Sequence, residues 1–245
     1  MTYQILLKYG LQWVVAISLV AATTISNAAE QDQGVKSSQA DTSAVKLSDF
    51  TYKPLLLDAP QTRVDGSTRG TDGETVILQV LAPEHTGLTL QAQPTLYWYT
   101  RTPVATRFEI ALIDKDKIEP LLAVEADGKK VAGIQQLDLG DHSISLQPEV
   151  SYQWSVTQVI DAGSQSKDVI ASGMIERRET DEGLSSRIKM SHGTDLVAVY
   201  ASEGIWYDAL ETISSMLEKS PEDQGLVAIR ASLLDQVGLQ ATTAD

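Results

Sequence analysis

The chain has 245 residues, of which 42% are hydrophobic and 21% charged, and its formal net charge is −14 at pH 7. A chain of this length can bury the core of one large or two small domains, and this composition excludes wholesale disorder. An acidic surface repels phosphate groups, so we expect neither nucleic acid nor an anionic membrane as a partner. Cysteine is absent, which excludes disulfides, thiolate metal sites and a cysteine nucleophile.

Residues 1–28 are typical of a secretory signal peptide. Lys8 is their only charged residue, Leu11–Val20 is mostly apolar, and Ser26-Asn27-Ala28 provides the small residues that a signal peptidase reads. We therefore expect cleavage before Ala29 and an exported protein, periplasmic or secreted, without a membrane segment. The alternative is an uncleaved membrane anchor, for which the apolar stretch is at the short limit.

Polar segments precede the first long strand. Residues 29–49 have no apolar periodicity, which predicts a flexible linker, and Phe50–Lys53 resembles a short strand. The glycine-rich stretch Arg63–Gly73 predicts a loop. Arg63 and Arg69 are basic side chains in an otherwise acidic protein, so they are candidate binding residues. Structural ion pairs with nearby carboxylates are the competing explanation.

The middle of the chain alternates with period two. The stretch Pro94–Thr100 places Leu96 and Trp98 on one face and Tyr97 and Tyr99 on the other, which is typical of a strand buried on both faces. The other expected strands are Thr75–Val80, Phe108–Leu112, Leu121–Val124, Ile134–Leu139, Tyr152–Thr157 and Val169–Ile175. Short strands separated by frequent turn signals predict an antiparallel β-sandwich rather than a βαβ fold.

A tyrosine corner is expected at the start of one of these strands. Leu146 and Pro148 precede Tyr152, the arrangement in which a phenol bonds back to the backbone at a crossover between sheets. Together with a buried tryptophan on an early strand, Trp98, it resembles fibronectin type III and related immunoglobulin-like domains. We expect Trp98, Tyr152 and Trp154 to be structural residues of the core.

After Arg178 the apolar period becomes helical. Helices are expected around Leu184–Ile188, Leu196–Tyr200, Trp206–Leu217 and Glu222–Val237. Within them Tyr200, the turn glycine Gly204, the small packing residue Ala209 and Pro221 fall at the offsets of one tetratricopeptide unit. Such repeats need about three copies to be stable. We therefore predict a helical hairpin that packs on the sandwich or on a partner.

The start of the third helix is a second candidate binding site. It contains Trp206, Tyr207 and Asp208. Core packing is the competing explanation for Trp206, which shares a face with Leu210, and we then expect Tyr207 to project to the surface.

Motifs for catalysis or for metal binding are missing from the sequence. His85, His142 and His192 lie in separate polar contexts without metal-ligand spacing, so we expect scattered, exposed histidines. The signatures of serine hydrolases, zinc proteases and dinucleotide enzymes are absent. We assign no catalytic residue, metal or cofactor.

Several stretches together resemble a family of exported bacterial proteins known as domain of unknown function 928. The resemblance covers residues 50–239 and is carried by Tyr52-Lys53-Pro54, the stretch Arg63–Gly70, Leu81-Ala82-Pro83, Pro94–Tyr99, Tyr152-Gln153-Trp154 and Tyr200–Leu210. It implies an exported protein with no established activity and no assigned catalytic residues.

These observations predict a signal peptide over 1–28, a linker over 29–49, a β-sandwich over 50–178, a helical region over 179–240 and a tail over 241–245. The leading functional hypothesis is a non-catalytic protein–protein interaction module of the cell envelope. The alternative is a module that binds carbohydrate or another small ligand through exposed aromatic side chains, Tyr97, Tyr99 and Tyr207. An unrecognised hydrolase is the third.

Overall fold

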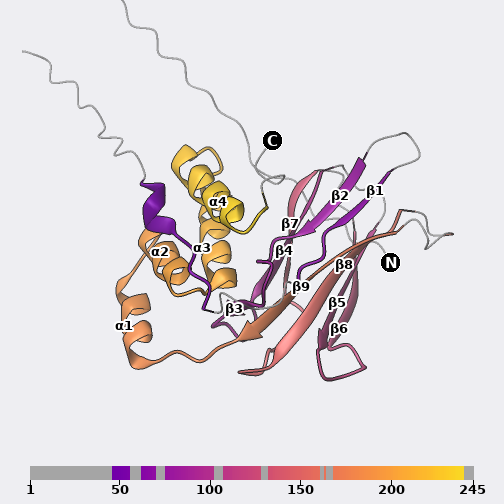
Figure 1. Ribbon diagram of the computed structural model, residues 1–245, viewed down its shortest axis with the longest axis horizontal. Coiled ribbons are helices and arrows are strands. Elements are labelled where there is room, and N and C mark those ends of the chain that lie inside the picture. The colour runs from indigo at the N-terminus through magenta and orange to yellow at the C-terminus, as the bar shows by residue number, and fades with distance from the viewer. Residues whose placement is uncertain are drawn as a thin grey trace, which may run out of the picture. The chain divides into compact units, whose positions relative to one another are not determined.

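Figure 1 shows the computed structural model of the chain, which describes residues 46–55, 62–69, 75–101, 107–127, 132–160, 163 and 168–239. The predicted signal peptide, most of the linker and the tail lie outside the described residues. In chain order the elements are η1 Leu47–Phe50, β1 Gly66–Arg69, β2 Thr75–Val80, β3 Gly87–Thr89, β4 Thr95–Thr100, β5 Arg107–Asp114, β6 Leu122–Asp127, β7 Gly133–Asp138, β8 Ser151–Gln158, β9 Val169–Arg177, α1 Glu182–Met190, α2 Thr194–Ser202, α3 Trp206–Lys219 and α4 Gln224–Gln236. All of them belong to one compact unit, Ser43–Asp245.

The strands form two sheets. The four-stranded sheet has the order β1-β2-β4-β7, and the five-stranded sheet has the order β3-β9-β8-β5-β6. Neighbouring strands are antiparallel except for β3, which runs parallel to β9. The prediction of a mainly β protein with C-terminal helices is confirmed (Figure 1).

The core lies between the two sheets. Trp98 of β4 packs edge-on against Phe108 of β5, with ring centroids 5.4 Å apart. Along β5 and β8 the side chains alternate between buried and more exposed positions, as expected for strands with one face in the core. In β4 all six side chains are buried, and on its other face Thr95 and Tyr97 lie against the helices. The prediction that this strand packs on both faces is confirmed.

The predicted tyrosine corner joins the start of β8 to the segment before it. The backbone N–H of Gln147 donates to the Tyr152 hydroxyl at 3.0 Å. Tyr152 and Trp154 are both buried. The bond fixes the path by which the chain enters β8, so the aromatic rings of this strand reach the core in one register.

Two of the four described helices, α1 and α4, begin at an aspartate that caps the backbone. The carboxylate of Asp181 accepts from the Leu184 N–H at the start of α1, and Asp223 caps α4 in the same way. Gly204 joins α2 to α3 with a φ of +72°, and a Cβ there would lie 2.7 Å from the Lys53 carbonyl oxygen. Only glycine accommodates both the backbone angle and this close contact. Within the described residues, no helix is long and apolar enough to cross a membrane.

Two predictions about the N-terminal part were wrong. The stretch Phe50–Lys53 is the end of η1 followed by extended chain, because its backbone N–H groups bond to helices: Tyr52 to the Gln236 side chain and Lys53 to the Ala201 carbonyl. Residues Gly66–Arg69, predicted as loop, form β1, which pairs with β2.

Glycine explains why a loop-like sequence can form this strand. A Cβ on Gly66 would lie 2.6 Å from the Ile170 carbonyl oxygen, so the close approach of β1 to β9 requires glycine. Sequence patterns also missed β3, which has only three residues and cannot show a period.

Candidate functional site

The three residues that open α3 anchor the helix to the sandwich. Trp206 donates from Nε1 to the Leu81 carbonyl at 2.9 Å, just after β2. The carboxylate of Asp208 accepts from the backbone N–H of Leu90, just after β3, at 3.1 Å. All three side chains are buried. The competing explanation for Trp206 therefore describes this stretch correctly, and the helix start is a docking element.

Tyr207 inserts into the core between the sheets. Its hydroxyl accepts from Nε1 of Trp154 at 2.8 Å and donates to the Met174 carbonyl at 3.0 Å. Burial raises the pKa of the phenol, which keeps its proton. The expectation that Tyr207 projects to the surface is wrong, since the side chain is 0% exposed. The ring lies so close to Gly87 that a Cβ there would approach it to 2.7 Å.

Two carboxylates of α3 face the segment between β3 and β4. Burial raises the pKa of Asp208 to about 7, and its Oδ1 has no hydrogen-bond partner among the described residues. Glu211 accepts from Nε2 of Gln91 and from the Thr95 hydroxyl, and burial raises its pKa as well. Helix docking is therefore coupled to the protonation of Asp208 and Glu211.

Arg63 has a structural position. Its side chain is 6% exposed, lies near Asp65 and Glu84, and donates from Nη1 to the carbonyls of Ala82 and Val237. The guanidinium thereby joins the segment before β1 to the end of α4. The backbone of Arg69 belongs to β1, whereas its side chain lies outside the described part of the chain. The structure does not bring these two arginines together as a described binding surface.

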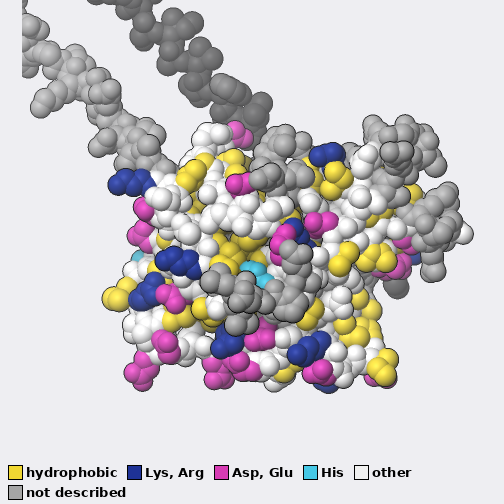
Figure 2. All heavy atoms as spheres, viewed as in Figure 1, with side chains coloured by type: hydrophobic (Ala, Val, Ile, Leu, Met, Phe, Trp, Pro, Cys, Tyr) yellow, Lys and Arg dark blue, Asp and Glu magenta, His cyan; other side chains and the backbone are white. Residues whose placement is uncertain are grey.

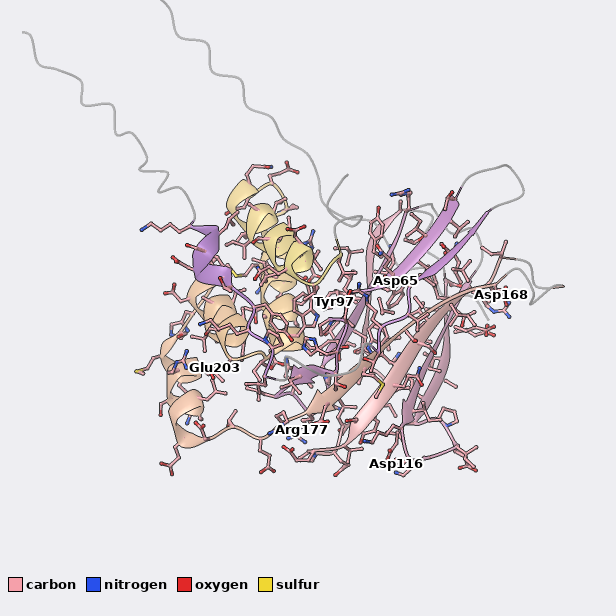
Figure 3. All side chains as sticks on the ribbon, in the orientation of Figure 1. Asp65, Tyr97, Asp116, Asp168, Arg177 and Glu203 are labelled. Atoms are coloured by element: carbon pink, nitrogen blue, oxygen red, sulfur yellow. The ribbon has the colours of Figure 1, made fainter. Side chains whose placement is uncertain are left out.

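The predicted exposed aromatic side chains of β4 are not at the surface. Tyr97 is 4% and Tyr99 2% exposed, so the expectation that either ring is free for recognition is wrong. For Tyr97 the cause is the cover that α3 and α4 provide over this part of the sheet, which places the ring between the helices and β4 (Figure 3). Ligand recognition through exposed aromatics is therefore not available on this strand.

A pocket of about 240 Å³ lies where the helices meet the sandwich, beside His85. Nε2 of His85 is 2.9 Å from the Tyr52 hydroxyl, and the two rings stack. Burial lowers the pKa of His85, which favours the neutral imidazole, and Glu176 and Arg178 also line the pocket. Figure 2 shows histidine side chains at the surface on this face of the molecule.

His85 was predicted to be a scattered, exposed residue, but it is half-buried. His142 and His192 are exposed, as predicted. The pairing of His85 with Tyr52 joins positions 33 apart in sequence, and no local motif indicates it. In the described part of the chain, no group of three or more His, Asp or Glu side chains could hold a metal ion.

The outer face of the five-stranded sheet carries a shallow trough of about 410 Å³ across β6, β5 and β8. Its floor is made of small side chains, because Ala123, Ala111 and Ser155 lie opposite one another on the three adjacent strands. Glu109 and Glu125 also line it. This trough is the candidate functional site, since it is the hollow on the sheet face that the helices leave uncovered.

One edge of the trough is the last strand of its sheet. Within the described residues β6 pairs only with β5, so its other edge presents backbone N–H and C=O groups without a neighbouring strand. Arg107 contacts both Glu109, at 3.0 Å, and Glu125, at 3.2 Å. One arginine between two glutamates leaves the border with a net negative charge.

A family model described as Domain of Unknown Function (DUF928) matches residues 64–245. The match covers more than half of the chain and confirms the family that the sequence motifs indicated. No curated protein matches the chain.

Proposed function

Since the chain belongs to the DUF928 family, whose description assigns no activity, we propose from its own geometry that it is a non-catalytic, protein-binding module of the cell envelope. The trough across β6, β5 and β8 carries the proposal. We propose that it takes an extended, positively charged segment of a partner protein, which pairs with β6 and lies over the trough.

The contrast between β4 and β5 supports this face as the binding surface. Both faces of β4 are buried, whereas β5 keeps Glu109 exposed and Ala111 half-buried on its outer face. Small floor residues leave room for the side chains of an added strand, which would point alternately into the trough and away from it. The strand edge supplies main-chain hydrogen bonds that require no particular partner sequence.

The negative charge of the trough favours a partner segment with positively charged side chains. The trough is lined by two glutamates, which one arginine contacts, and the whole chain has a net charge of −14. Lysine or arginine side chains of a partner would relieve the repulsion between Glu109 and Glu125, which Arg107 offsets only in part. An acidic segment would add to that repulsion.

Two capped peptides of alternating sequence test the proposal, one of lysine and valine and one of glutamate and valine. We expect the lysine peptide to shift the backbone amide NMR signals of β5 and β6 and the glutamate peptide to leave them unchanged. Glu125→Lys should weaken binding of the lysine peptide, whereas Glu182→Lys on α1, which changes the net charge equally, should not. Equal binding of both peptides, or shifts confined to the helices, would refute the proposal.

The place in the cell envelope is supported by the N-terminal sequence, whose residues lie outside the described part. Mass spectrometry of the mature protein tests it. We expect a chain that begins at Ala29, and an intact Met1 or Thr2 terminus on a cytoplasmic protein would contradict export.

The finer fold assignment belongs to the same proposal. The strand order supports an immunoglobulin-like or fibronectin III-like sandwich. In one sheet β2, β4 and β7 correspond to strands A, B and E of that fold. In the other sheet β5, β8 and β9 correspond to strands C, F and G. The glycine turn between α2 and α3 and the buried Ala209 support one tetratricopeptide-like hairpin. Here the sandwich would take the place that neighbouring repeats occupy in an array.

A further inference from the structure

A separate pocket of about 230 Å³ lies between the outer face of the four-stranded sheet and the last two helices. Tyr97, Ser214 and Leu217 are its buried residues, and Arg230 of α4 also lines it. Figure 3 shows Tyr97 in the layer between helices and sheet. The pocket is on the opposite sheet from the trough, so it is independent of the proposed function.

Arg230 has a charge without a counter-charge. The side chain is half-buried, and burial lowers the pKa of its guanidinium, with the Tyr97 phenol as the one ionisable group that opposes this shift. Among the described residues no carboxylate forms an ion pair with Arg230. A partly desolvated guanidinium is costly unless an anion binds it, and its five N–H donors suit a carboxylate.

Ser214 provides a second unpaired group in the same pocket. The residue is 4% exposed, and its Oγ is buried without a hydrogen-bond partner among the described residues. Its neighbour in α3, Thr212, donates instead to the carbonyl one turn back, and Ser186 of α1 does the same. This Oγ has almost no accessible surface, so it adds a buried polar atom to the lining, and a ligand reaches it only if the side chain rotates.

The rest of the lining defines the other parts of a ligand. Ile134, Leu217 and Val227 provide apolar walls, and Glu218 is an exposed carboxylate that lines the same pocket. Glu218 forms no ion pair with Arg230. A ligand with a carboxylate alone would be repelled by Glu218, whereas a zwitterion satisfies both charges.

We infer that this pocket binds a small aliphatic zwitterion of the α-amino acid class. Its carboxylate contacts Arg230, its ammonium group faces Glu218, and its side chain lies against Leu217 and Val227.

Three probes that differ by one charged group test this inference by isothermal titration calorimetry on the purified chain. They are L-leucine, 4-methylpentanoate, which lacks the ammonium group, and L-leucinamide, which lacks the carboxylate. We expect leucine to bind at millimolar concentration or below and each of the other two to bind about ten-fold more weakly, the loss of one hydrogen-bonded charge. No binding of leucine, or equal binding of leucine and leucinamide, would overturn the inference.

Substitutions assign each contact. Arg230→Gln should abolish the preference for leucine over leucinamide, and Glu218→Gln should abolish its preference over 4-methylpentanoate. Arg187→Gln on α1 is the matched control and should change neither ratio. Val227→Trp alters an exposed side chain at the wall and should block all three probes while the chain stays folded. Unchanged leucine binding in the Val227→Trp variant would place the ligand elsewhere.

Discussion

The two sheets of the sandwich have different outer faces, although their inner faces form the same core. On the outer face of the four-stranded sheet α3 and α4 pack against β4, where Tyr97 is buried, whereas Gln136 and Asp138 of the neighbouring β7 stay exposed. The outer face of the five-stranded sheet keeps alternating exposed side chains along β5 and β8. The chain therefore covers the centre of one sheet with its own helices, and the other sheet is the one on which we propose that a partner binds.

Because of this difference, the aromatic residues of this chain do not indicate a binding surface. Aromatic side chains on a strand or at a helix start are good candidates for recognition when they are exposed. Here Tyr97 and Tyr207 belong to the contact between helices and sandwich, and the trough on the open face is lined by alanine, serine, threonine, glutamate, isoleucine and valine, without an aromatic residue. Aromatic content marks the internal interface of this protein.

Removal of the Tyr207 ring is expected to have the largest effect. Tyr207→Ala leaves a cavity in the core and an unpaired Trp154 Nε1–H, so we expect the free energy of unfolding to fall by about 3–5 kcal/mol. Tyr207→Phe keeps the ring and should lower it by about 1–3 kcal/mol. Urea denaturation measures both. A Tyr207→Ala variant as stable as the natural chain would mean that the helices do not cover the sheet as described.

The buried carboxylate of Asp208 on α3 should make the free energy of unfolding depend on pH. Burial raises the pKa of Asp208 to about 7 in the folded chain, above its ordinary value of 3.8. Between these values the folded chain binds a proton that the unfolded chain has released. The free energy of unfolding therefore falls as pH rises through this window, by about 4 kcal/mol at most, and is level above it.

Asp208→Asn isolates this contribution, because the amide oxygen can still accept from the Leu90 N–H. We expect the variant to lose less thermal stability than the natural chain between about pH 5 and pH 8. Some dependence should remain, since burial also raises the pKa of Glu211. An identical pH dependence of stability in the two proteins would show that the pKa of Asp208 is not raised in the folded chain.

Local patterns predicted the parts of the fold that depend on neighbouring residues. The alternation in Pro94–Thr100, the proline before β8 with the tyrosine at its start, and the apolar period of α3 each lie within one segment, so the strand, the corner and the helix could all be predicted. The short strand β3 has no period of its own, and it forms because it pairs with β9, which is distant in sequence.

The sites depend on distant contacts. Tyr207 is buried because its hydroxyl meets Trp154, 53 positions earlier, and no pattern in α3 indicates that contact. The floor of the trough combines Ala123, Ala111 and Ser155, and it exists only once the registers of three strands are known. Ser214 looks like any helical serine until its lack of a bond is seen in the folded chain.

A smaller effect is expected at the tyrosine corner, which belongs to the uncovered sheet and does not involve the helices. Tyr152→Phe removes the bond from the Gln147 N–H, and we expect the free energy of unfolding to fall by about 1 kcal/mol. The pH dependence of stability should be unchanged, in contrast to Asp208→Asn. Denaturation of both variants at two pH values checks this, and a change of pH dependence in Tyr152→Phe would link the two sheets.

The smallest effect on stability is expected on the open face, where the effect on binding should be large. Ala111→Arg places a long side chain in the trough, with its charge in solvent and near Glu109, so the free energy of unfolding should change by no more than about 0.5 kcal/mol. The same residue introduced on the covered face, Tyr97→Arg, would bury a charge under α3 and should be strongly destabilising.

Ala111→Arg should nevertheless abolish binding of the lysine and valine peptide, because it fills the trough and cancels the charge that selects the peptide. If Ala111→Arg destabilises the chain as much as Tyr97→Arg, both outer faces are covered, and the trough is not a binding surface.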